Sequence, residues 1–441
     1  MELPLFIIYL IIWFWLTVKR KKHEGLYSTF FIFGLSVFAY FVLIPFEMYV
    51  RGEEYFFLYN WIRLGFYERN LIILLSIISL FGFYFGLKLS CYRLLPIKNF
   101  MKNNENGLNK NHHWQPVRIL FCIITVCGFI LIIFYRDLIL AQQDYHRAYQ
   151  ITYESPFFSF IKTHFLIALG LTAGLIKRKV WRWKGKIISF AIVVLITYVG
   201  IFTSDKEPLL IALLTCASFI EFNKMSFRKF IIFCLLGSMC VIVLVLFFNI
   251  YRTRISFSEA LRQIPWTEIS FKKLDPAGPM VSLGTVIRDD HMPLRYGKTY
   301  INSICIIVPK AIWPNRPLIL SEEFARDIMP DYSEGKGLGY SPLAEALLNF
   351  HVPGAFIHFF ILAFLFGSFF EFLRKVIFVN ENSFLVLFIY IVGYKIIIMS
   401  FRAPLISPIK SLIIFMAPYC FVFLLLRSLR KIVSLTKEHI C

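Results

Sequence analysis

The chain has 441 residues, of which 58% are hydrophobic and 17% are charged, and its mean hydropathy is +0.67. A soluble domain of this length does not have such a composition, whereas a protein that crosses a membrane many times does. The formal net charge of +20 does not indicate nucleic-acid binding, because the basic residues lie in short clusters between apolar runs, as in cytoplasmic loops.

The start of the chain and its cysteines bear on whether the protein has a signal peptide, disulfides or a zinc site. Residues 1–4 (MELP) carry no basic region and no small-residue cleavage site follows, so we expect a retained first span and not a removed signal peptide. Most of the nine cysteines lie in apolar runs and none forms a CxxC pair. The sequence therefore indicates neither a disulfide framework nor a zinc site.

Apolar runs long enough to cross about 30 Å of hydrocarbon recur along the chain. We expect eleven spans, which makes the fold an all-α polytopic membrane protein. They cover residues 3–18, 27–48, 71–89, 117–135, 157–176, 187–202, 208–220, 230–250, 353–372, 383–400 and 405–426.

Basic clusters follow every second span, starting with Lys19-Arg20-Lys21-Lys22 after the first. Because Lys and Arg are retained on the cytoplasmic side, this alternation predicts an outer N-terminus, a cytoplasmic C-terminus and an outer position for the long segment 251–350. The short span at 208–220 is the weakest prediction, but omitting it would break the alternation.

The 100-residue segment 251–350 is too polar for a bilayer to hold, and we expect it to be a partly helical outer loop. It carries twelve basic and eleven acidic residues, so it is mixed in charge and is not a basic patch. Ser258, Ser321 and Ser341 are positioned to cap short helices, the last with Pro342 at the first helical position. We therefore divide the chain into residues 1–250 (eight spans), 251–350 (outer loop) and 351–441 (three spans).

Seven cations lie at the outward ends of the predicted spans: Lys162, Lys206, Arg252, Arg254, Lys395, Arg402 and Lys410. An ionisable group in hydrocarbon is costly, so it is a functional candidate, although a single Lys can also extend its head to water. A ring of cations suits a polyanion such as a lipid diphosphate, which Arg can grip with two parallel hydrogen bonds.

Other groups of residues are weaker indications of a functional site. His351 and His358 share a helical face, which permits a metal pair but is more typical of hydrogen-bonded core histidines. Asp289-Asp290 is similar to the acidic pair of soluble glycosyltransferases, yet no nucleotide-binding domain accompanies it, and adjacent acids in a loop are usually solvated. The chain has no P-loop, GxSxG or HExxH motif. Glu345 lies in the first turn of a predicted helix, where the helix dipole favours an acid with or without a catalytic role.

The long segment carries a recognisable signature. It reads YGKTY at 296–300, IVPKAIWPNRP at 307–317, GLGYSPLAEA at 337–346 and Asn349-Phe350, followed by a span that begins near Gly354. In these residues, in its number of spans and in an Arg near the end of a late span, the chain resembles the Wzy-type O-antigen polymerases. It departs from them at His351, where a glycine is expected, and at 204–206, where an Arg-containing turn is more usual. An Arg-x10-Gly spacing, at Arg326 and Gly337, is a weak match.

The resemblance implies a GT-C-like polymerase/ligase architecture and a membrane glycosyltransferase that needs no metal and no other cofactor. Such an enzyme polymerises lipid-linked oligosaccharide repeat units at the outer face of the bacterial cytoplasmic membrane. It transfers the growing glycan from polyprenyl diphosphate to the non-reducing end of an incoming unit. The expected partners are the lipid-linked oligosaccharide and the bilayer, with a chain-length regulator and a flippase as further possibilities and no nucleic acid.

Residue roles follow from this chemistry, in which negative charge builds on the departing diphosphate and the acceptor hydroxyl needs a base. Glu345 is the first choice for the base, with Asp290 and His291 behind it. Arg254 and Arg402 complete the catalytic set. The expected diphosphate or glycan contacts are Lys206, Arg252, Arg288, Lys310, Arg316, Arg326 and Tyr340. Trp313, Tyr300 and Tyr340 could stack on sugar rings or serve the core instead.

Two other functions remain open from the sequence. A related O-antigen ligase would move finished glycan to a lipid core with similar chemistry. A flippase or transporter of the lipid-linked unit would have short loops and a charged central cavity, whereas here the charges gather at the outer ends and one loop is long.

Overall fold

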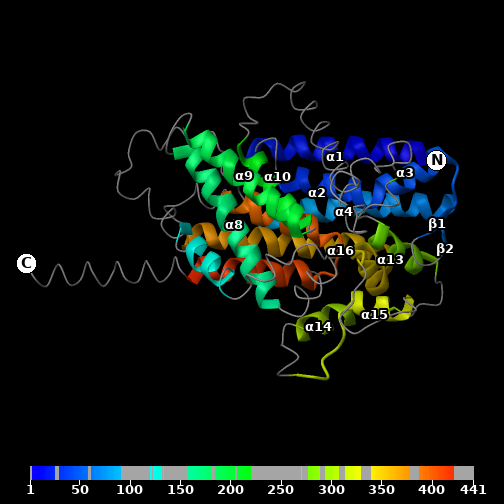
Figure 1. Ribbon diagram of the computed structural model, residues 1–441. Coiled ribbons are helices and arrows are strands. Elements are labelled where there is room, and N and C mark those ends of the chain that lie inside the picture. Colours follow the sequence, from blue (N-terminus) through cyan, green and yellow to red (C-terminus); the bar gives the residue numbers. More distant parts are fainter. Residues whose placement is uncertain are drawn as a thin grey trace, which may run out of the picture. The chain divides into compact units, whose positions relative to one another are not determined.

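The computed structural model describes residues 2–24, 29–57, 61–90, 120–121, 123–131, 133, 156–179, 184–203, 206–219, 270, 277–288, 294–306, 313–328, 339–377 and 387–421. The chain is built mainly from helices (Figure 1). They are α1 (Glu2–Glu24), α2 (Thr29–Val37), α3 (Leu43–Arg51), α4 (Phe66–Leu89), α8 (Pro156–Lys179), α9 (Lys184–Thr203), α10 (Lys206–Phe219), α13 (Ala277–Arg288), α14 (Lys298–Cys305), α15 (Leu320–Ile328), α16 (Pro342–Phe372) and α18 (Tyr394–Ser400). A further apolar helix covers Ile406–Phe421.

The prediction of an α-helical membrane protein is confirmed, with two additions. Among the described residues, four helices are long and apolar enough to cross a membrane: Glu2–Arg20, Thr29–Arg51, Phe66–Leu89 and Pro342–Lys375. Shorter apolar helices lie at the predicted spans 157–176, 187–202, 208–220, 383–400 and 405–426. The predicted span 230–250 lies outside the described residues and 117–135 is described only in part, so the count of eleven stays a prediction.

The two additions are local. An antiparallel pair of three-residue strands, β1 (Tyr55–Phe57) and β2 (Trp61–Arg63), precedes α4, with Phe56 opposite Ile62. Aromatic and β-branched residues favour strands, which accounts for this pair. Short π-helical turns also interrupt helices, at Phe38–Val42, Leu373–Ile377 and Ile389–Gly393.

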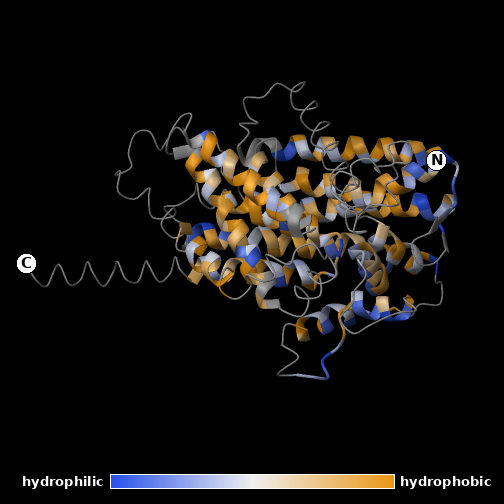
Figure 2. Ribbon diagram, viewed as in Figure 1, coloured by the Kyte–Doolittle hydropathy of each residue, from blue (hydrophilic) through white to orange (hydrophobic). Residues whose placement is uncertain are grey.

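The described chain divides into two compact units, which we treat separately. Unit 1 comprises Met1–Pro96, Ile269–Leu373 and Ile396–Ile414, and unit 2 comprises Ile97–Glu268, Arg374–Lys395 and Phe415–Cys441. Figure 2 shows that α1, α4 and α16, three helices of unit 1, are hydrophobic along most of their length.

Unit 1 is centred on the close packing of α4 against α16. A Cβ atom added to Gly82 would lie 2.4 Å from the carbonyl oxygen of Phe356, and one added to Gly86 would lie 2.4 Å from that of Phe360. This GxxxG pair lets the two backbones approach as membrane helices do at small-residue interfaces. Because residue numbers rise together along the contact, α4 and α16 run parallel and begin at the same end of unit 1 (Figure 1).

Aromatic side chains fill the centre of unit 1 around Phe401. Its ring lies 5.4 Å from that of Phe33, 5.9 Å from that of Phe359 and 5.8 Å from that of Phe41, measured between centroids. All four rings are fully buried. The residues that follow α18 are therefore anchored in the same core as α2 and α16.

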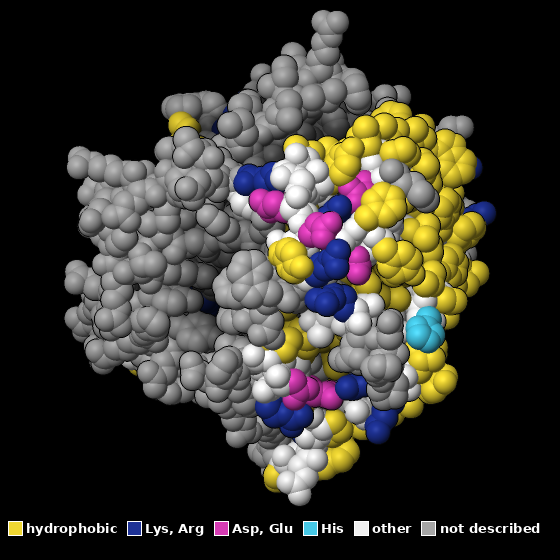
Figure 3. Space-filling model, turned by 90° about the vertical axis from the view of Figure 1, so that its right-hand side faces the viewer, with side chains coloured by type: hydrophobic (Ala, Val, Ile, Leu, Met, Phe, Trp, Pro, Cys, Tyr) yellow, Lys and Arg dark blue, Asp and Glu magenta, His cyan; other side chains and the backbone are white. Residues whose placement is uncertain are grey.

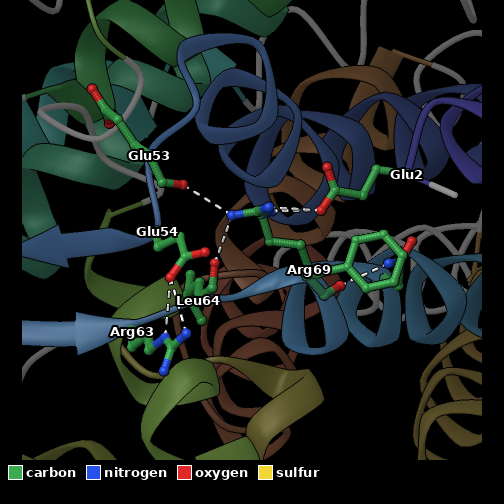
Figure 4. A network of polar contacts seen from close by, with 8 residues as sticks. Glu2, Glu53, Glu54, Arg63, Leu64 and Arg69 are labelled. Carbon is green, nitrogen blue, oxygen red and sulfur yellow. Dashed lines mark hydrogen bonds and ion pairs between the residues drawn. The ribbon is translucent and has the colours of Figure 1, made fainter.

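A buried ion pair closes the end of unit 1 at which α1 and α4 begin (Figure 4). The Nε and Nη2 atoms of Arg69 both lie 2.8 Å from Oε1 of Glu2, and Nη1 donates to the carbonyl oxygens of Glu53 and Leu64 at 2.9 and 2.8 Å. Burying a guanidinium without partners would be costly, and these contacts offset that cost. The contacts tie the start of α1 to the segment around β1 and β2.

Unit 2 contains the packed helices α8, α9 and α10. The Oγ of Ser189 in α9 donates to the carbonyl oxygen of Ala173 in α8 at 2.8 Å. In α8, a Cβ at Gly170 would lie 2.6 Å from the Oγ1 atom of Thr215 in α10. The three helices therefore pack through small residues, as α4 and α16 do.

Candidate functional site

The described part of the long segment folds into short helices, as its capping residues predict. The Oγ of Ser341 accepts a hydrogen bond from the backbone N of Ala344 at 3.2 Å, and Pro342 opens α16, so this predicted cap is confirmed. Helix α15 begins at Leu320, so Ser321 lies inside its first turn and the cap predicted there is wrong. The cap predicted at Ser258 lies outside the described residues.

Glu345 is the centre of a buried polar network in unit 1. Its side chain is fully buried, and each carboxylate oxygen accepts a hydrogen bond. Oε1 accepts from the Thr299 hydroxyl of α14 at 3.0 Å, and Oε2 accepts from the backbone N of Leu405 at 2.7 Å. Leu405 directly precedes the helix Ile406–Phe421, whose N-terminal dipole favours an acid there. Glu345 therefore joins three segments that are distant in sequence.

Asn349 extends this network by one helical turn. Its Nδ2 donates to the Thr299 hydroxyl and to the carbonyl oxygen of Glu345, both at 2.7 Å, and its Oδ1 accepts from the backbone N of Gly297 at 2.8 Å. The backbone N of Arg295 donates to the carbonyl oxygen of Leu348 at 2.8 Å. The turn before α14 is thus held against the first part of α16 by both side-chain and backbone contacts.

Two strained residues flank this junction. Tyr296 has a φ of 43° and His351 a φ of 51°, a left-handed region that residues with side chains rarely adopt. At His351 the backbone breaks α16 into two helical parts, and a Cβ at Gly354 would lie 2.1 Å from the carbonyl oxygen of Ala346. With a ψ of −147°, His351 has a conformation that suits glycine, which explains why a glycine is expected at this position.

His358 follows the break and lies in the apolar part of α16. Its Nδ1 lies 3.0 Å from the Tyr300 hydroxyl of α14, and it is almost fully buried. His351 is exposed, so the two histidines do not share one environment. The core interpretation fits His358. Among the described residues, no group of three or more His, Cys, Asp or Glu side chains could hold a metal ion.

A backbone hydrogen bond connects Tyr340 and Arg402. The backbone N of Tyr340 donates to the carbonyl oxygen of Arg402 at 2.9 Å, and the next residue, Ser341, donates from its backbone N to the Ser282 hydroxyl of α13 at 2.8 Å. The Tyr340 ring packs edge-on against Phe324 and is buried, so it cannot stack on a sugar here. Burial raises the pKa of Tyr340, so its hydroxyl keeps its proton.

The remaining predicted cations are not brought together in the described residues. Arg326 is exposed and lies 3.4 Å from Asp327, Arg288 is exposed at the end of α13, and Arg316 donates to the carbonyl oxygen of Ile306. The side chain of Lys206 and the residues Arg252, Arg254, Asp290, His291 and Lys310 lie outside the described structure.

Charges of both signs mix at the end of unit 1 at which α1 begins. On the described part of this face, Figure 3 shows acidic and basic side chains interspersed, with apolar side chains gathered towards one edge. In the described part of the long segment, the guanidinium of Arg295 and the carboxylate of Glu323 make two hydrogen bonds of 3.0 and 2.8 Å. The hydrogen bond to Glu323 raises the pKa of Arg295, which therefore stays charged.

Unit 2 has its own buried charge cluster. The Nζ atom of Lys395 contacts Oε1 of Glu207 at the start of α10 and lies 4.0 Å from the ring centroid of Phe415. The same Glu207 oxygen accepts from the Thr163 hydroxyl of α8 at 3.0 Å. Lys395 was singled out from the sequence, whereas Glu207 was not. The signal that could have found it is an acid at the edge of an apolar run.

Thr299 and Asn349 were also not assigned roles from the sequence. Both lie in the signature stretches, YGKTY and Asn349-Phe350, so their place in those motifs was the available signal. The hydrogen bond between them joins residues that are fifty positions apart in the sequence, and hydrophobic periodicity does not reveal such a contact.

Comparison with known proteins identifies a family. The family model for the O-antigen polysaccharide polymerase Wzy matches residues 2–432. No curated protein and no solved structure matches the chain.

Proposed function

Because the chain belongs to the O-antigen polysaccharide polymerase Wzy family, we propose that it polymerises lipid-linked oligosaccharide repeat units at the outer face of the bacterial cytoplasmic membrane. It transfers the growing glycan from polyprenyl diphosphate to the non-reducing end of an incoming unit, without a metal. The match over residues 2–432, nearly the whole chain, is the observation that carries this proposal.

The arrangement of unit 1 supports a reaction site at one end of this unit. The start of α1, the beginning of α4, the described part of the long segment and the start of α16 all lie at the same end, because α4 and α16 run parallel and Arg69 pairs with Glu2. This agrees with a topology in which the N-terminus and the long segment share the outer side. A substrate held in the outer leaflet by its polyprenyl chain could reach that end.

Arg402 and Arg254 are the proposed contacts to the departing diphosphate. Fixed cations aimed at a developing charge are the main contribution that this chemistry needs from the protein. The backbone of Arg402 is held by Tyr340, which precedes the Ser341 cap of α16. The segment that carries this guanidinium is therefore anchored to the helix that bears Glu345. Lys206, Arg252, Arg288, Lys310, Arg316 and Arg326 remain proposed glycan or diphosphate contacts.

For Glu345 the geometry favours a positioning role over the general base that the sequence suggests. A base must reach the hydroxyl proton that it removes. In this structure both oxygens of Glu345 are instead occupied by Thr299 and Leu405, and the side chain is fully buried. We propose that Glu345 fixes the position of the turn that carries Arg402.

The glycan pattern of a deletion strain tests this function. Loss of a polymerase leaves lipid cores capped by a single repeat unit, whereas loss of a ligase leaves no capped cores. Loss of a flippase also removes capped cores, because no unit reaches the outer face. Single-unit caps that return to a full ladder on complementation would support the proposal, and an absence of caps would refute it.

A further inference from the structure

The helix α14 has its polar and apolar faces reversed relative to its neighbour α15. In α15, the apolar Leu320 and Phe324 are buried, while the charged Arg326 and Asp327 are exposed, as on an ordinary surface helix. In α14, by contrast, Thr299 and Ser303 are buried. Two residues of its opposite face, Ile301 and Ile304, are 64% and 65% exposed. In contact with water alone, a helix with exposed isoleucines and buried hydroxyl groups would be unfavourable.

The buried hydroxyl face of α14 is explained by its partners. Thr299 donates to Glu345 and accepts from Asn349, and the neighbouring Tyr300 meets His358. These contacts fix the rotation of α14 about its axis. Ile301 and Ile304 are therefore held outward, away from unit 1, and cannot turn inward without breaking the network.

The depth of α14 identifies what covers its outer face. Tyr300 contacts His358, which lies inside the candidate span Pro342–Lys375 and five residues beyond Pro353, where the sequence predicts that the span begins. At a rise of about 1.5 Å per residue, this contact lies roughly 7 Å inside the span. Interfacial helices bury their apolar faces about 5–10 Å into the boundary between headgroups and acyl chains. Lys298, exposed at the start of α14, is suited to the headgroup level.

We propose that α14 lies in the membrane interface at this end of unit 1, with Ile301 and Ile304 in contact with the acyl chains of bilayer lipids. The segment from which it comes was expected from the sequence to stay clear of the bilayer. Its lipid contact places the Glu345 network beside the leaflet, and this inference does not depend on which reaction the protein performs.

Spin labels on single cysteines test this placement. The full-length chain, with its native cysteines replaced, is reconstituted in phosphatidylethanolamine–phosphatidylglycerol vesicles after labelling of Ile301→Cys or Ile304→Cys. Asp327→Cys on α15, whose side chain is 60% exposed, is the matched control. We expect labels at 301 and 304 to collide more with oxygen, which dissolves in lipid, than with a water-soluble nickel chelate, and the control label to show the reverse.

Two results would overturn the proposal. Labels at 301 and 304 that meet the nickel chelate as readily as the control label would place α14 in water. Labels that neither agent reaches would mean that protein, such as a second copy of the chain or a partner, covers this face. The Ile301→Leu and Ile304→Leu variants should melt like the wild type, which would show that each position tolerates a side chain of a different shape.

Discussion

Glu345 and Leu405 are sixty residues apart, yet the Glu345 carboxylate accepts a 2.7 Å hydrogen bond from the Leu405 backbone N. This contact joins the start of α16 to the turn that carries Arg402. The same carboxylate binds Thr299, so one side chain sets the relative positions of α14, α16 and that turn. The proposed site therefore depends on a residue that is fully enclosed by protein.

The proposed positioning role of Glu345 predicts linked losses of stability and activity. Glu345→Gln replaces one acceptor with a donor, which leaves the backbone N of Leu405 or the Thr299 hydroxyl without its partner. We expect a loss of about 1–3 kcal/mol in the free energy of unfolding, together with shorter glycans. Thermal melting in detergent and glycan ladders from complemented cells measure the two effects.

The control for this prediction is Thr299→Val, which keeps the shape of the side chain and removes the hydroxyl. It should reproduce part of both effects, because it acts on the same network. A Glu345→Gln protein that melts like the wild type but adds no repeat units would instead support a general base.

The GxxxG contact predicts that methyl groups are not tolerated on that face of α4. Gly82→Ala and Gly86→Ala each bring a Cβ within 2.4 Å of a backbone carbonyl oxygen of α16, so the helices must separate. We expect about 1–3 kcal/mol of destabilisation for each variant, measured as a lower melting temperature.

Gly278→Ala serves as the comparison for the two α4 variants. The nearest atom that its Cβ would meet is the backbone N of Gly339 at 3.5 Å, so this variant should melt close to the wild type. Equal melting temperatures for all three variants would show that the close packing of α4 and α16 is not needed.

The strained backbone at His351 predicts a stabilising substitution. His351→Gly removes the side chain that disfavours a φ of 51° and a ψ of −147°, so the melting temperature should rise. Relief of the strain should add about 1–3 kcal/mol to the free energy of unfolding. The greater conformational entropy of glycine in the unfolded chain offsets part of this gain. Val352→Gly, in the helical part that follows, should lower it. A fall for His351→Gly would mean that contacts of the imidazole outweigh the strain.

The proposed diphosphate contact predicts a large effect at Arg402. Charge-assisted hydrogen bonds contribute about 1.5–3 kcal/mol, so Arg402→Ala should slow transfer by about 10- to 150-fold. Single-unit caps should then replace the ladder, while the amount of protein in the membrane is unchanged. Arg254→Ala should act in the same way, and Arg402→Lys should recover part of the activity.

Arg63→Ala is a suitable control for the arginine variants. Arg63 forms an exposed pair with Glu54, and such pairs contribute at most about 1 kcal/mol. Its glycan ladder should match the wild type. A full ladder from Arg402→Ala would remove Arg402 from the site.

The sequence by itself determined the class of the protein, most of its helices and its family. Apolar runs and the Ser341-Pro342 cap are local signals, because hydrophobic burial and helix capping depend on residues near one another in the chain. The YGKTY and GLGYSPLAEA stretches likewise sufficed for the resemblance that the family match confirms.

Only the tertiary structure decided which of those residues meet. The Glu345 bonds to Thr299 and Leu405, the Arg69–Glu2 ion pair and the Lys395–Glu207 pair span between 46 and 188 residues. Hydrogen bonds and ion pairs of this kind depend on how helices pack, and a hydropathy pattern does not specify the partners of a helix face. For the same reason the sequence could mark Glu345 as unusual, whereas the fold showed that its carboxylate is already engaged by the protein itself.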